Sequence, residues 1–374
     1  MYSTSSTTKI KSINKKKVYM LLKKGNAYTK RDIALATNIS LPTVTQNLLE
    51  LQDAGLVLQI GSTPSTGGRK AENFQLSTNV FYSIGLDITR NHVAILIMNL
   101  SERITYHKRF SLKFTKEDQY FSNLADLISK ILSENKIDES KILGVGISVP
   151  VIVMQNQLGL SCSTILGTSG ISLENFTRFI PFPCVLCNDA KVAASAELRT
   201  NSLYRDILYL SLSNTVGGAI IHNRSICVGL HERSGEFGHM RIYPNGRPCY
   251  CGQLGCFDAY CNATILSRYE NNSLENFFKE LEKGNLEYQE LFHEYLDNLA
   301  IGLNNLHMIF DYPIILGGYV GSFIKPYIPS IKKRLEKLNT FEKNASYIHA
   351  CNLQLEASAV GAAYLFLDRF ESQL

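Results

Sequence analysis

The chain has 374 residues, 45% of them hydrophobic, and a formal net charge of +5 at pH 7. This length exceeds what one small core needs and suits two or three domains. No run of eighteen apolar residues occurs, and the basic N-terminal segment lacks the apolar core of a signal peptide. We therefore expect a cytoplasmic protein with no membrane partner.

The charge is distributed unevenly along the chain. Residues 1–80 contain eleven lysines and arginines against four aspartates and glutamates, whereas the rest contains 27 against 29. A basic front end on a nearly neutral body is typical of a nucleic-acid-binding module attached to a domain that binds another ligand.

The front end has the spacing of a helix-turn-helix. The apolar pattern predicts helices at about residues 10–24, 30–37 and 41–53, with Gly25 ending the first. Ala34 is small where two helices would touch, and Asn38 tolerates the positive φ of a turn. Thr29 is the expected cap of the second helix.

The third helix, Leu41–Asp53, is the expected recognition helix. Ser40 is a candidate cap and Pro42 suits its first turn. We expect its outward face to offer short hydrogen-bonding side chains to base edges and phosphates in a major groove. These side chains are Thr43, Thr45, Gln46 and Asn47.

A two-stranded wing is expected to follow. Residues 56–60 and 72–76 read as strands, joined by a turn rich in Gly, Pro and Ser. Arg69 and Lys70 would lie at its tip and contact a minor groove or phosphates. The alternative is a solvated helical hairpin with a lysine-rich tail. On the first interpretation, residues 1–78 form a winged helix-turn-helix DNA-binding domain.

The body, from residue 79, is predicted to be α/β. Expected strands and helices are, in order, 82–88, 92–100, 103–114, 120–135 (helix), 141–150, 183–198 (strand into helix), 206–229 (hairpin) and 312–328 (strand, glycine turn and helix). The repetition predicts two lobes around a cleft. The expected first lobe is 79–190, completed by a C-terminal helix at 355–374, and the second is 191–354.

A histidine and three cysteines are gathered in the stretch GHMRIYPNGRPCYCGQLGC, residues 238–256. Such a C-x-C-x4-C run with an upstream histidine offers four thiolate and imidazole ligands, which suit a closed, structural zinc site. The predicted ligands are His239, Cys249, Cys251 and Cys256. Gly246, Gly252 and Gly255 would let the loop curl around the ion. The alternative is a chance cluster of reduced cysteines.

The same stretch, extended to GEFGHMRIYPNGRPCYCGQLGCFDAY, resembles the signature of the ROK family of bacterial repressors, open reading frames and sugar kinases. GVGISVP, CNDAKVAASAEL, IILGG and the front end with its STGGRK wing resemble other family elements in the same order, so the resemblance covers nearly the whole chain. The arrangement is similar to the xylose and N-acetylglucosamine repressors of that family. It implies an actin-like, sugar-kinase-like body and a sugar-responsive transcriptional regulator that is not an enzyme.

The resemblance also implies a sugar pocket. The positions that match the family's sugar-binding residues are Asn188, Asp189, Glu236, His239 and Asp258. Carboxylates, amides and imidazole suit the paired hydroxyls of a sugar. Taken singly, Asp189 could be a helix cap and Glu236 a surface charge. Asp258 stands where the family usually has Glu, so its contact could run through water, or the ligand could differ.

The alternative function is a ROK-type sugar kinase with Asp189 as base. Kinases of the family hold ATP phosphates with two glycine loops, which here read DITRN (87–91) and SNTVG (213–217). Lost glycines place β-carbons where backbone should approach phosphate, which favours a non-catalytic sensor. Gly317 and Gly318 match the family's adenosine-side turn, although such a pair can also serve packing alone.

The implied partners are operator DNA and a small effector. A homodimer, or a homotetramer, would set two recognition helices into successive major grooves of an inverted repeat. The effector would be a sugar or a sugar phosphate that closes the two lobes and changes the spacing of the helices.

Overall fold

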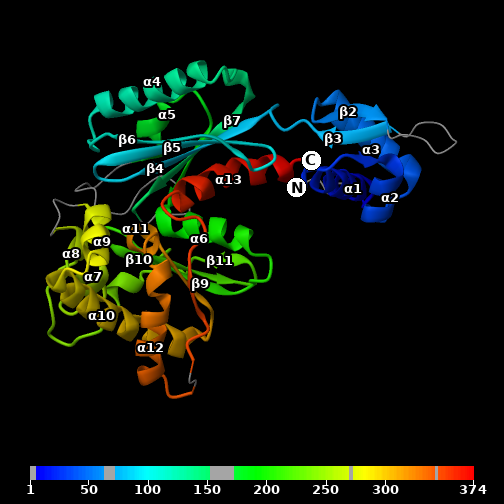
Figure 1. Ribbon diagram of the computed structural model, residues 1–374. Coiled ribbons are helices and arrows are strands. Elements are labelled where there is room, and N and C mark those ends of the chain that lie inside the picture. Colours follow the sequence, from blue (N-terminus) through cyan, green and yellow to red (C-terminus); the bar gives the residue numbers. More distant parts are fainter. Residues whose placement is uncertain (1–5, 63–71, 152–171, 269–272, 342–343) are drawn as a thin grey trace.

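The structure is a computed structural model whose described residues form three sheets, one in the front end and two in the body (Figure 1). It describes residues 6–62, 72–151, 172–268, 273–341 and 344–374. Figure 1 shows the body as two stacked lobes with the front end to one side. No described helix has the length and apolar character that crossing a membrane requires. The predicted fold class, a helical front end plus a two-lobed α/β body, is confirmed.

The front end contains three helices and three short strands. They are α1 (Ser6–Leu22), β1 (Tyr28–Thr29), α2 (Lys30–Thr37), α3 (Leu41–Asp53), β2 (Val57–Ser62) and β3 (Glu72–Leu76). Thr29 and Asp32 form a reciprocal capping box at the start of α2, as the sequence predicted for Thr29. Asn38 adopts φ 55° between α2 and α3, which is the left-handed turn expected of it.

Two details of the front end differ from the prediction. The side chain of Ser40 makes no capping hydrogen bond, because its Oγ lies 2.9 Å from Oγ1 of Thr43 instead. Strand β1 pairs antiparallel with β3, so the wing hairpin of β2 and β3 is extended to three strands. The predicted wing tip, with Arg69 and Lys70, lies outside the described residues.

The first lobe is a five-stranded sheet between helices. Its elements are β4 (Tyr82–Ile88), β5 (His92–Asn99), β6 (Ile104–Ser111), α4 (Asp118–Glu134), β7 (Ile142–Val149), α5 (Leu173–Thr177), β8 (Cys184–Asn188) and α13 (Ala357–Ser372). The strand order is β6-β5-β4-β7-β8, with β4, β7 and β8 parallel. Helices α4 and α13 cover opposite faces of this sheet (Figure 1).

Helix α13 approaches the first sheet very closely. A β-carbon built on Gly85 of β4 would lie 1.9 Å from the carbonyl oxygen of Ala359, and one on Gly146 of β7 would lie 2.0 Å from that of Ala362. Both contacts are with backbone, which cannot move aside. These two glycines therefore let α13 lie directly on the centre of the sheet.

The second lobe contains a five-stranded sheet and most of the remaining helices. Its elements are α6 (Asp189–Thr200), β9 (Ile207–Leu212), β10 (Val216–His222), β11 (Ser225–Cys227), α7 (Asp258–Cys261), α8 (Thr264–Ser267), α9 (Leu274–Glu282), α10 (Leu286–Phe310), β12 (Ile314–Gly317), α11 (Gly318–Gly321), α12 (Ile328–Leu338) and β13 (Ile348–Ala350). The strand order is β11-β10-β9-β12-β13. Strand β12 runs parallel to β9 and β13.

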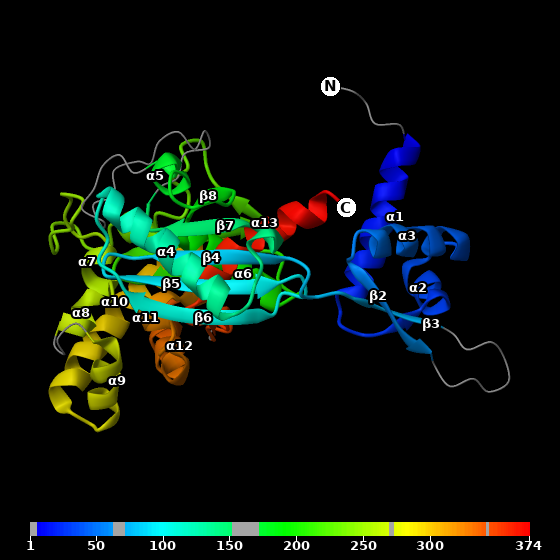
Figure 2. The same cartoon turned by 90° about the horizontal axis from the view of Figure 1, so that it is seen from above.

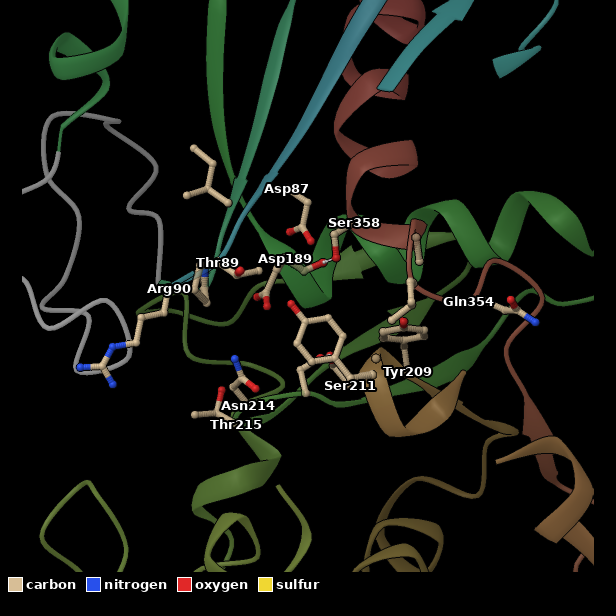
Figure 3. Close-up of a pocket in the computed structure, with 17 residues that line it drawn as sticks. Asp87, Thr89, Arg90, Asp189, Tyr209, Ser211, Asn214, Thr215, Gln354 and Ser358 are labelled. Atoms are coloured by element: carbon tan, nitrogen blue, oxygen red, sulfur yellow. Dashed lines mark hydrogen bonds between the residues drawn. The ribbon is translucent and has the colours of Figure 1, made fainter. Parts of the chain in front are cut away.

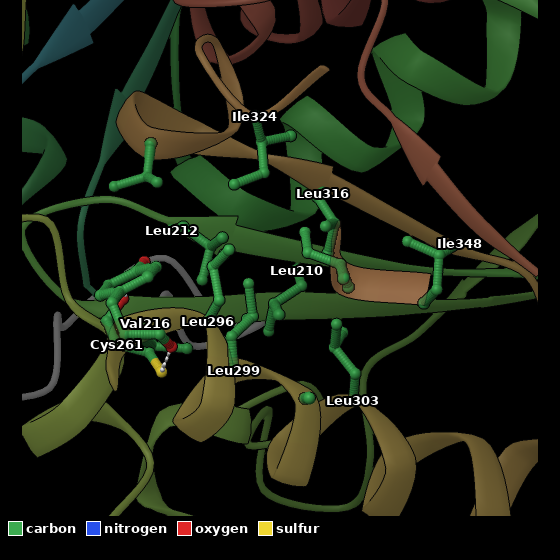
Figure 4. Packing of buried hydrophobic residues seen from close by; sticks show 14 of the residues in the cluster. Leu210, Leu212, Val216, Cys261, Leu296, Leu299, Leu303, Leu316, Ile324 and Ile348 are labelled. Atoms are coloured by element: carbon green, nitrogen blue, oxygen red, sulfur yellow. Dashed lines mark hydrogen bonds between the residues drawn. The ribbon is translucent and has the colours of Figure 1, made fainter. Parts of the chain in front are cut away.

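Successive side chains of β9 point to opposite faces of the second sheet. Leu208, Leu210 and Leu212 pack into the larger core with α10, where Leu296, Leu299 and Leu303 meet them (Figure 4). Tyr209, on the opposite face, packs with Ala193 and Ala194 of α6. Helix α6 also packs against α13, so these two helices form the layer between the sheets.

The front end is attached to the C-terminal end of α13. The ring of Tyr19 in α1 lies 6.3 Å from that of Phe370, which also contacts Phe81. Figure 2 shows the front end beside this end of α13, on the far side of the body from α7, α8 and α9. One helix thus connects the front end with the middle of the body.

Candidate functional site

Asn188 and Asp189 stand where β8 passes into α6. The amide oxygen of Asn188 accepts the backbone N–H of Lys191 at 3.0 Å, and its amide nitrogen donates to the carbonyl of Val151. Asn188 is therefore the N-cap of α6. This leaves the carboxyl group of Asp189 free to face the space between the lobes.

The carboxyl groups of Asp87 and Asp189 point into one cleft between the lobes (Figure 3). The cleft is lined by the ends of β4 and β9, by the turn after β9 and by the first turn of α13. Burial raises the pKa of Asp189 to about 7, and the charge of Asp87 adds to this. Burial raises the pKa of Asp87 to about 6. Two such carboxyl groups can accept or donate hydrogen bonds near neutral pH.

Two segments, 87–91 and 213–217, match the phosphate loops of the family's kinases, and here they line the cleft with side chains. Thr89 and Arg90 come from the β4–β5 turn, and Asn214 and Thr215 from the β9–β10 turn. Figure 3 shows Arg90 extending away from Asp87 and Asp189. Side chains thus occupy positions where a phosphate loop presents backbone N–H groups.

The glycine pair after β12 is required by packing. A β-carbon on Gly317 would lie 2.1 Å from the hydroxyl of Tyr209. Gly318 has φ +77° and lies against Ser213 and Leu212. Both glycines are therefore explained without a nucleotide.

Glu236 lies between the cleft and the cysteine loop. It precedes the short 3-10 turn Phe237–His239 and is half-buried. Burial raises its pKa, while the neighbouring His239 and Lys191 oppose that shift. The charge of Glu236 in turn contributes to the raised pKa of Asp189.

Asp258, the fifth predicted sugar residue, is 2% exposed and already bonded to protein. One of its carboxylate oxygens accepts the backbone N–H of Val216 at 2.6 Å, and the other accepts the amide of Asn262 at 3.2 Å. Of the five predicted residues, Asp189 lines the described cleft, whereas Asn188, Glu236, His239 and Asp258 do not. The side chain of Asp258, which is shorter than the Glu usual at this position, thus joins β10 to α7.

The histidine and three cysteines of the loop come together as predicted. The ligand atoms of His239, Cys249, Cys251 and Cys256 all lie within 4.8 Å of one another, so these four residues could hold a metal ion. Nδ1 of His239 faces Cys249 at 4.0 Å, and its Nε2 lies 3.2 Å from the hydroxyl of Tyr250. This arrangement assigns one ring nitrogen to the cluster and the other to a neighbouring hydroxyl.

Positive φ angles let the cysteine loop fold this tightly. Gly252 has φ +86° and Gly255 has φ +77°. A β-carbon on Gly255 would lie 1.6 Å from the carbonyl oxygen of Tyr243, and one on Gly246 would lie 2.2 Å from the hydroxyl of Tyr260. The predicted role of the glycines in the loop therefore has a steric basis.

The predicted DNA-contacting face of α3 needs one correction. Asn47 is 1% exposed and lies with Val44, Leu48 and Leu51 on the buried face of α3. The expectation that it faces outward is wrong, because it follows Val44 by three positions and so shares its face. Gln46 is exposed, while Thr43 and Thr45 are half-buried.

Several cleft residues escaped prediction. Tyr209, Tyr319, Gln354 and Ser358 line the cleft, but each comes from a segment far from Asp189 in the chain. No local spacing signals such a juxtaposition. The alternation of β9 could have placed Tyr209 opposite its leucines, which was the one available signal.

The fold and site define a two-lobed α/β protein with a cluster of one histidine and three cysteines beside its cleft and a basic three-helix front end. The sequence pattern of the ROK family matches residues 83–369, and the chain belongs to this family. The resemblance seen in the sequence is thereby confirmed.

Individual relatives extend the similarity to the front end. The chain is 22% identical to the xylose repressor of Bacillus subtilis strain 168 over 376 residues, which covers 97% of each chain. It superposes on the crystal structure of a ROK family transcriptional regulator, described as a homologue of the E. coli MLC protein, with a TM-score of 0.75, 17% identity and 97% coverage of both chains. A ROK family glucokinase from Streptomyces griseus, in complex with glucose and AMPPNP, gives a TM-score of 0.65 at 23% identity, over 76% of this chain and 98% of that chain.

Proposed function

We propose that this ROK family protein is a sugar-responsive, DNA-binding transcriptional regulator, acting as a repressor of carbohydrate-metabolism genes through a non-catalytic body. The observation that carries the proposal is the course of α13. Its first turn, with Ala357 and Ser358, lines the cleft, and Glu371 in its last turn bonds to Lys23 just after α1. A ligand that moves α13 would therefore move the front end.

The DNA-binding role is assigned to the front end. Helix α3 would enter the major groove with Thr43, Thr45 and Gln46, and the wing would contribute Arg69 and Lys70. Asn47, being buried, would support the helix and not contact bases. The named repressor from B. subtilis, which matches this chain along 97% of its length, supports this assignment. A homodimer or homotetramer on an inverted repeat would match two such helices to two half-sites.

The sugar-binding role is assigned to Asn188, Asp189, Glu236, His239 and, through water or local rearrangement, Asp258. The mutual effects of these charges on pKa, Glu236 on Asp189 and His239 on Glu236, are consistent with a shared pocket. Carboxyl groups and imidazole bind the hydroxyl groups of sugars by accepting and donating hydrogen bonds. The ligand would bind the closed form of the cleft more tightly than the open form, which is what a response requires.

The metal assigned to the cysteine loop is structural zinc. Three sulfur atoms and one imidazole nitrogen within 4.8 Å of one another match the donor set and number that zinc prefers. Bound zinc would cross-link the loop and fix the ring of His239. Nε2 of that ring lies 3.2 Å from the hydroxyl of Tyr250, and a sugar hydroxyl that binds His239 would replace this contact.

The second candidate is a ROK-type sugar kinase. It is favoured by Asp189, whose pKa of about 7 suits a base that takes a proton from a sugar hydroxyl. It is opposed by the side chains of Thr89, Arg90 and Asn214, which line the cleft at the positions of both phosphate loops. Sugar-dependent ATP turnover by the purified protein would establish the kinase.

DNA binding tests the proposed function directly. Fluorescence anisotropy should show that the protein binds the DNA that flanks its own gene in preference to random DNA of equal length. One or more members of a panel of aldoses, amino sugars and their phosphates should change that affinity at least tenfold. A folded protein that binds both DNAs equally, with no response to the panel, would contradict the proposal.

A further inference from the structure

Helix α6 carries a lysine in its first turn, where a positive charge is unfavourable. Lys191 follows the N-cap residue Asn188 by three positions. The aligned peptide dipoles give the N-terminus of a helix a partial positive charge, which repels a cation placed there. The side chain of Lys191 is also only 13% exposed. A cation in this position requires a partner that compensates for both the dipole and the burial.

Glu232 is that partner. The ammonium group of Lys191 donates to the backbone carbonyl of Glu232 at 3.0 Å and lies 3.4 Å from Oε2 of its carboxylate. The side chain of Glu232 is 12% exposed, so both charges are largely shielded from water. The contact, which we call the latch, joins the start of α6 to a segment 41 positions away, between β11 and the Phe237–His239 turn.

The segment that the latch holds is otherwise weakly attached. Among residues 229–233, Glu232 alone is not exposed, and Leu230 is 92% exposed. The N–H of Glu232 lies 3.5 Å from the carbonyl of Gly229, which makes a weak hydrogen bond. Glu232 has φ +58°, a left-handed conformation that residues other than glycine rarely adopt. Such a conformation persists where surrounding contacts hold it, and Lys191 supplies two of them.

The latch lies next to residues assigned to the sugar. The amide oxygen of Asn188 accepts the backbone N–H of Lys191 at 3.0 Å, and Glu236 follows Glu232 by four positions. Burial raises the pKa of Glu236, and the charges of His239 and Lys191 oppose that shift. Lys191 therefore contacts one side of the predicted sugar site through its backbone and acts on the other side through its charge.

We propose that Lys191 is a positioning residue for the sugar site, where it latches residues 229–233 to the start of α6 and thereby holds Glu236 beside Asn188 and Asp189. The side chain of Lys191 is engaged with Glu232 and does not need to touch the sugar. It supports residues that would do so, and such supporting contacts fix the geometry of a binding site. The role in sugar binding rests on the proposed function, whereas the latch itself does not.

A tryptophan reporter tests the latch without any ligand. The chain contains no tryptophan, so Leu230→Trp places a single indole on the exposed part of the segment. The fluorescence anisotropy of this reporter should fall when Lys191→Met is added, because the released segment moves more freely on the nanosecond timescale. Lys191→Arg should restore it, since a guanidinium group can donate to both oxygens of Glu232. An anisotropy that Lys191→Met leaves unchanged would overturn the proposal.

Sugar affinity tests the positioning role. The probe is whichever member of the panel of aldoses, amino sugars and their phosphates binds the full-length wild-type protein most tightly by calorimetry. Lys191→Met should bind it about tenfold more weakly, which corresponds to the loss of one hydrogen bond to a charged group. Lys191→Arg should recover most of that loss. An unchanged affinity in Lys191→Met, or no recovery in Lys191→Arg, would reject the role.

A control and a second variant separate the latch from general effects. Lys130→Met is the control, because the ion pair of Lys130 with Glu134 on α4 is 3.9 Å long and exposed, and its affinity should equal that of the wild type. An equal loss in this control would reject the role of Lys191. If Lys191→Met does not fold, as judged by circular dichroism, Glu232→Gln replaces it, because it removes the charge from the other end of the same ion pair. Glu232→Gln should lower both the anisotropy and the affinity, and no change in either would overturn the proposal.

The two measurements distinguish failure of the latch from failure of the proposed function. A wild-type protein that binds no member of the panel would contradict the proposed function. The anisotropy of the reporter would still decide whether Lys191 holds the segment, because that measurement uses neither sugar nor DNA.

Discussion

The ammonium group of Lys23 lies 2.6 Å from a carboxylate oxygen of Glu102 and also bonds to the carboxylate of Glu371 in the last turn of α13. The side chains of Lys23 and Glu371 are each 9% exposed. Glu102 in turn pairs with Arg199 of α6 at 2.7 Å. A single lysine just after α1 is thus bonded directly to α13 and, through Glu102, to α6.

We expect Lys23→Met to weaken this junction. Removing the cation leaves the buried carboxylate of Glu371 without its partner, while Glu102 keeps Arg199, which should lower the free energy of unfolding by about 1–3 kcal/mol. Urea denaturation measures the change. The matched control is Lys30→Met, since the ion pair of Lys30 with Glu72 is 3.4 Å long and well exposed, and its loss should cost less than about 1 kcal/mol. If both variants lose the same free energy of unfolding, Lys23 stabilises the protein no more than an exposed lysine does.

The ionisation of Asp189 should make stability depend on pH. Burial and the charge of Asp87 raise the pKa of Asp189 from its usual 3.8 to about 7. The folded state therefore holds this proton after the unfolded chain has lost it, and stability falls as pH rises from about 4 to about 7. The slope from this one group is at most about 1.4 kcal/mol per pH unit.

Asp189→Asn should remove that part of the pH dependence and weaken sugar binding. Thermal unfolding between pH 4 and pH 8 gives the first result, with Asp126→Asn as the control because Asp126 is exposed on α4 and lies outside the cleft. A stability profile of Asp189→Asn that runs parallel to the wild type over this range would show that Asp189 is not buried as described.

Helix α13 depends on two glycines of the sheet. Gly85→Ala would place a β-carbon 1.9 Å from the carbonyl oxygen of Ala359, so the helix must shift or the variant must unfold. We expect a loss of at least about 3 kcal/mol in the free energy of unfolding, because backbone on both sides resists the change. Gly217→Ala is the control, since its β-carbon would lie 3.6 Å from that of Ala190, an ordinary contact. Chemical denaturation of both variants measures the difference.

Much of this fold follows from local signals. The positions of α3 at Leu41–Asp53 and β4 at Tyr82–Ile88 agree with prediction to the residue. A proline in the first turn marks α3, and apolar residues at every second position mark β4. The cysteine loop was recognised because all four ligands lie within eighteen residues. Local patterns of this kind reveal only those sites whose residues lie close together in the sequence.

The remaining features depend on contacts between distant segments. Ser358 reaches the cleft because α13 returns to the first sheet after the second lobe is complete. Asp258 likewise accepts the backbone N–H of Val216, 42 positions earlier in the chain, and its predicted contact with a sugar stays a prediction. The periodicity of residues within one segment does not predict these contacts between distant segments.

Loss of one cysteine should release the metal from the loop. We expect purified protein to contain one zinc ion per chain and Cys251→Ser to contain far less, because three remaining ligands bind zinc more weakly. Elemental analysis of dialysed protein measures this. Cys227→Ser is the control, since Cys227 in β11 is outside the cluster. If wild-type protein produced in zinc-containing medium contains no metal after purification, the assignment is contradicted.

The burial of Asn47 distinguishes a residue that packs inside the front end from one that contacts DNA, which the sequence alone did not do. Its amide nitrogen is buried and has no hydrogen-bond partner among the described residues. Asn47→Leu should therefore leave stability unchanged or raise it by about 1 kcal/mol, since an apolar side chain of similar size fits between Val44 and Leu51 without an unsatisfied donor. Operator affinity, measured by anisotropy, should stay within about threefold of the wild type, because that side chain cannot reach a base. Gln46→Ala provides the contrast, since Gln46 is exposed on the same helix and should lose about 1–3 kcal/mol of specific binding. If Asn47→Leu instead weakens DNA binding as strongly as Gln46→Ala while the fold stays intact, α3 must rotate when it binds DNA.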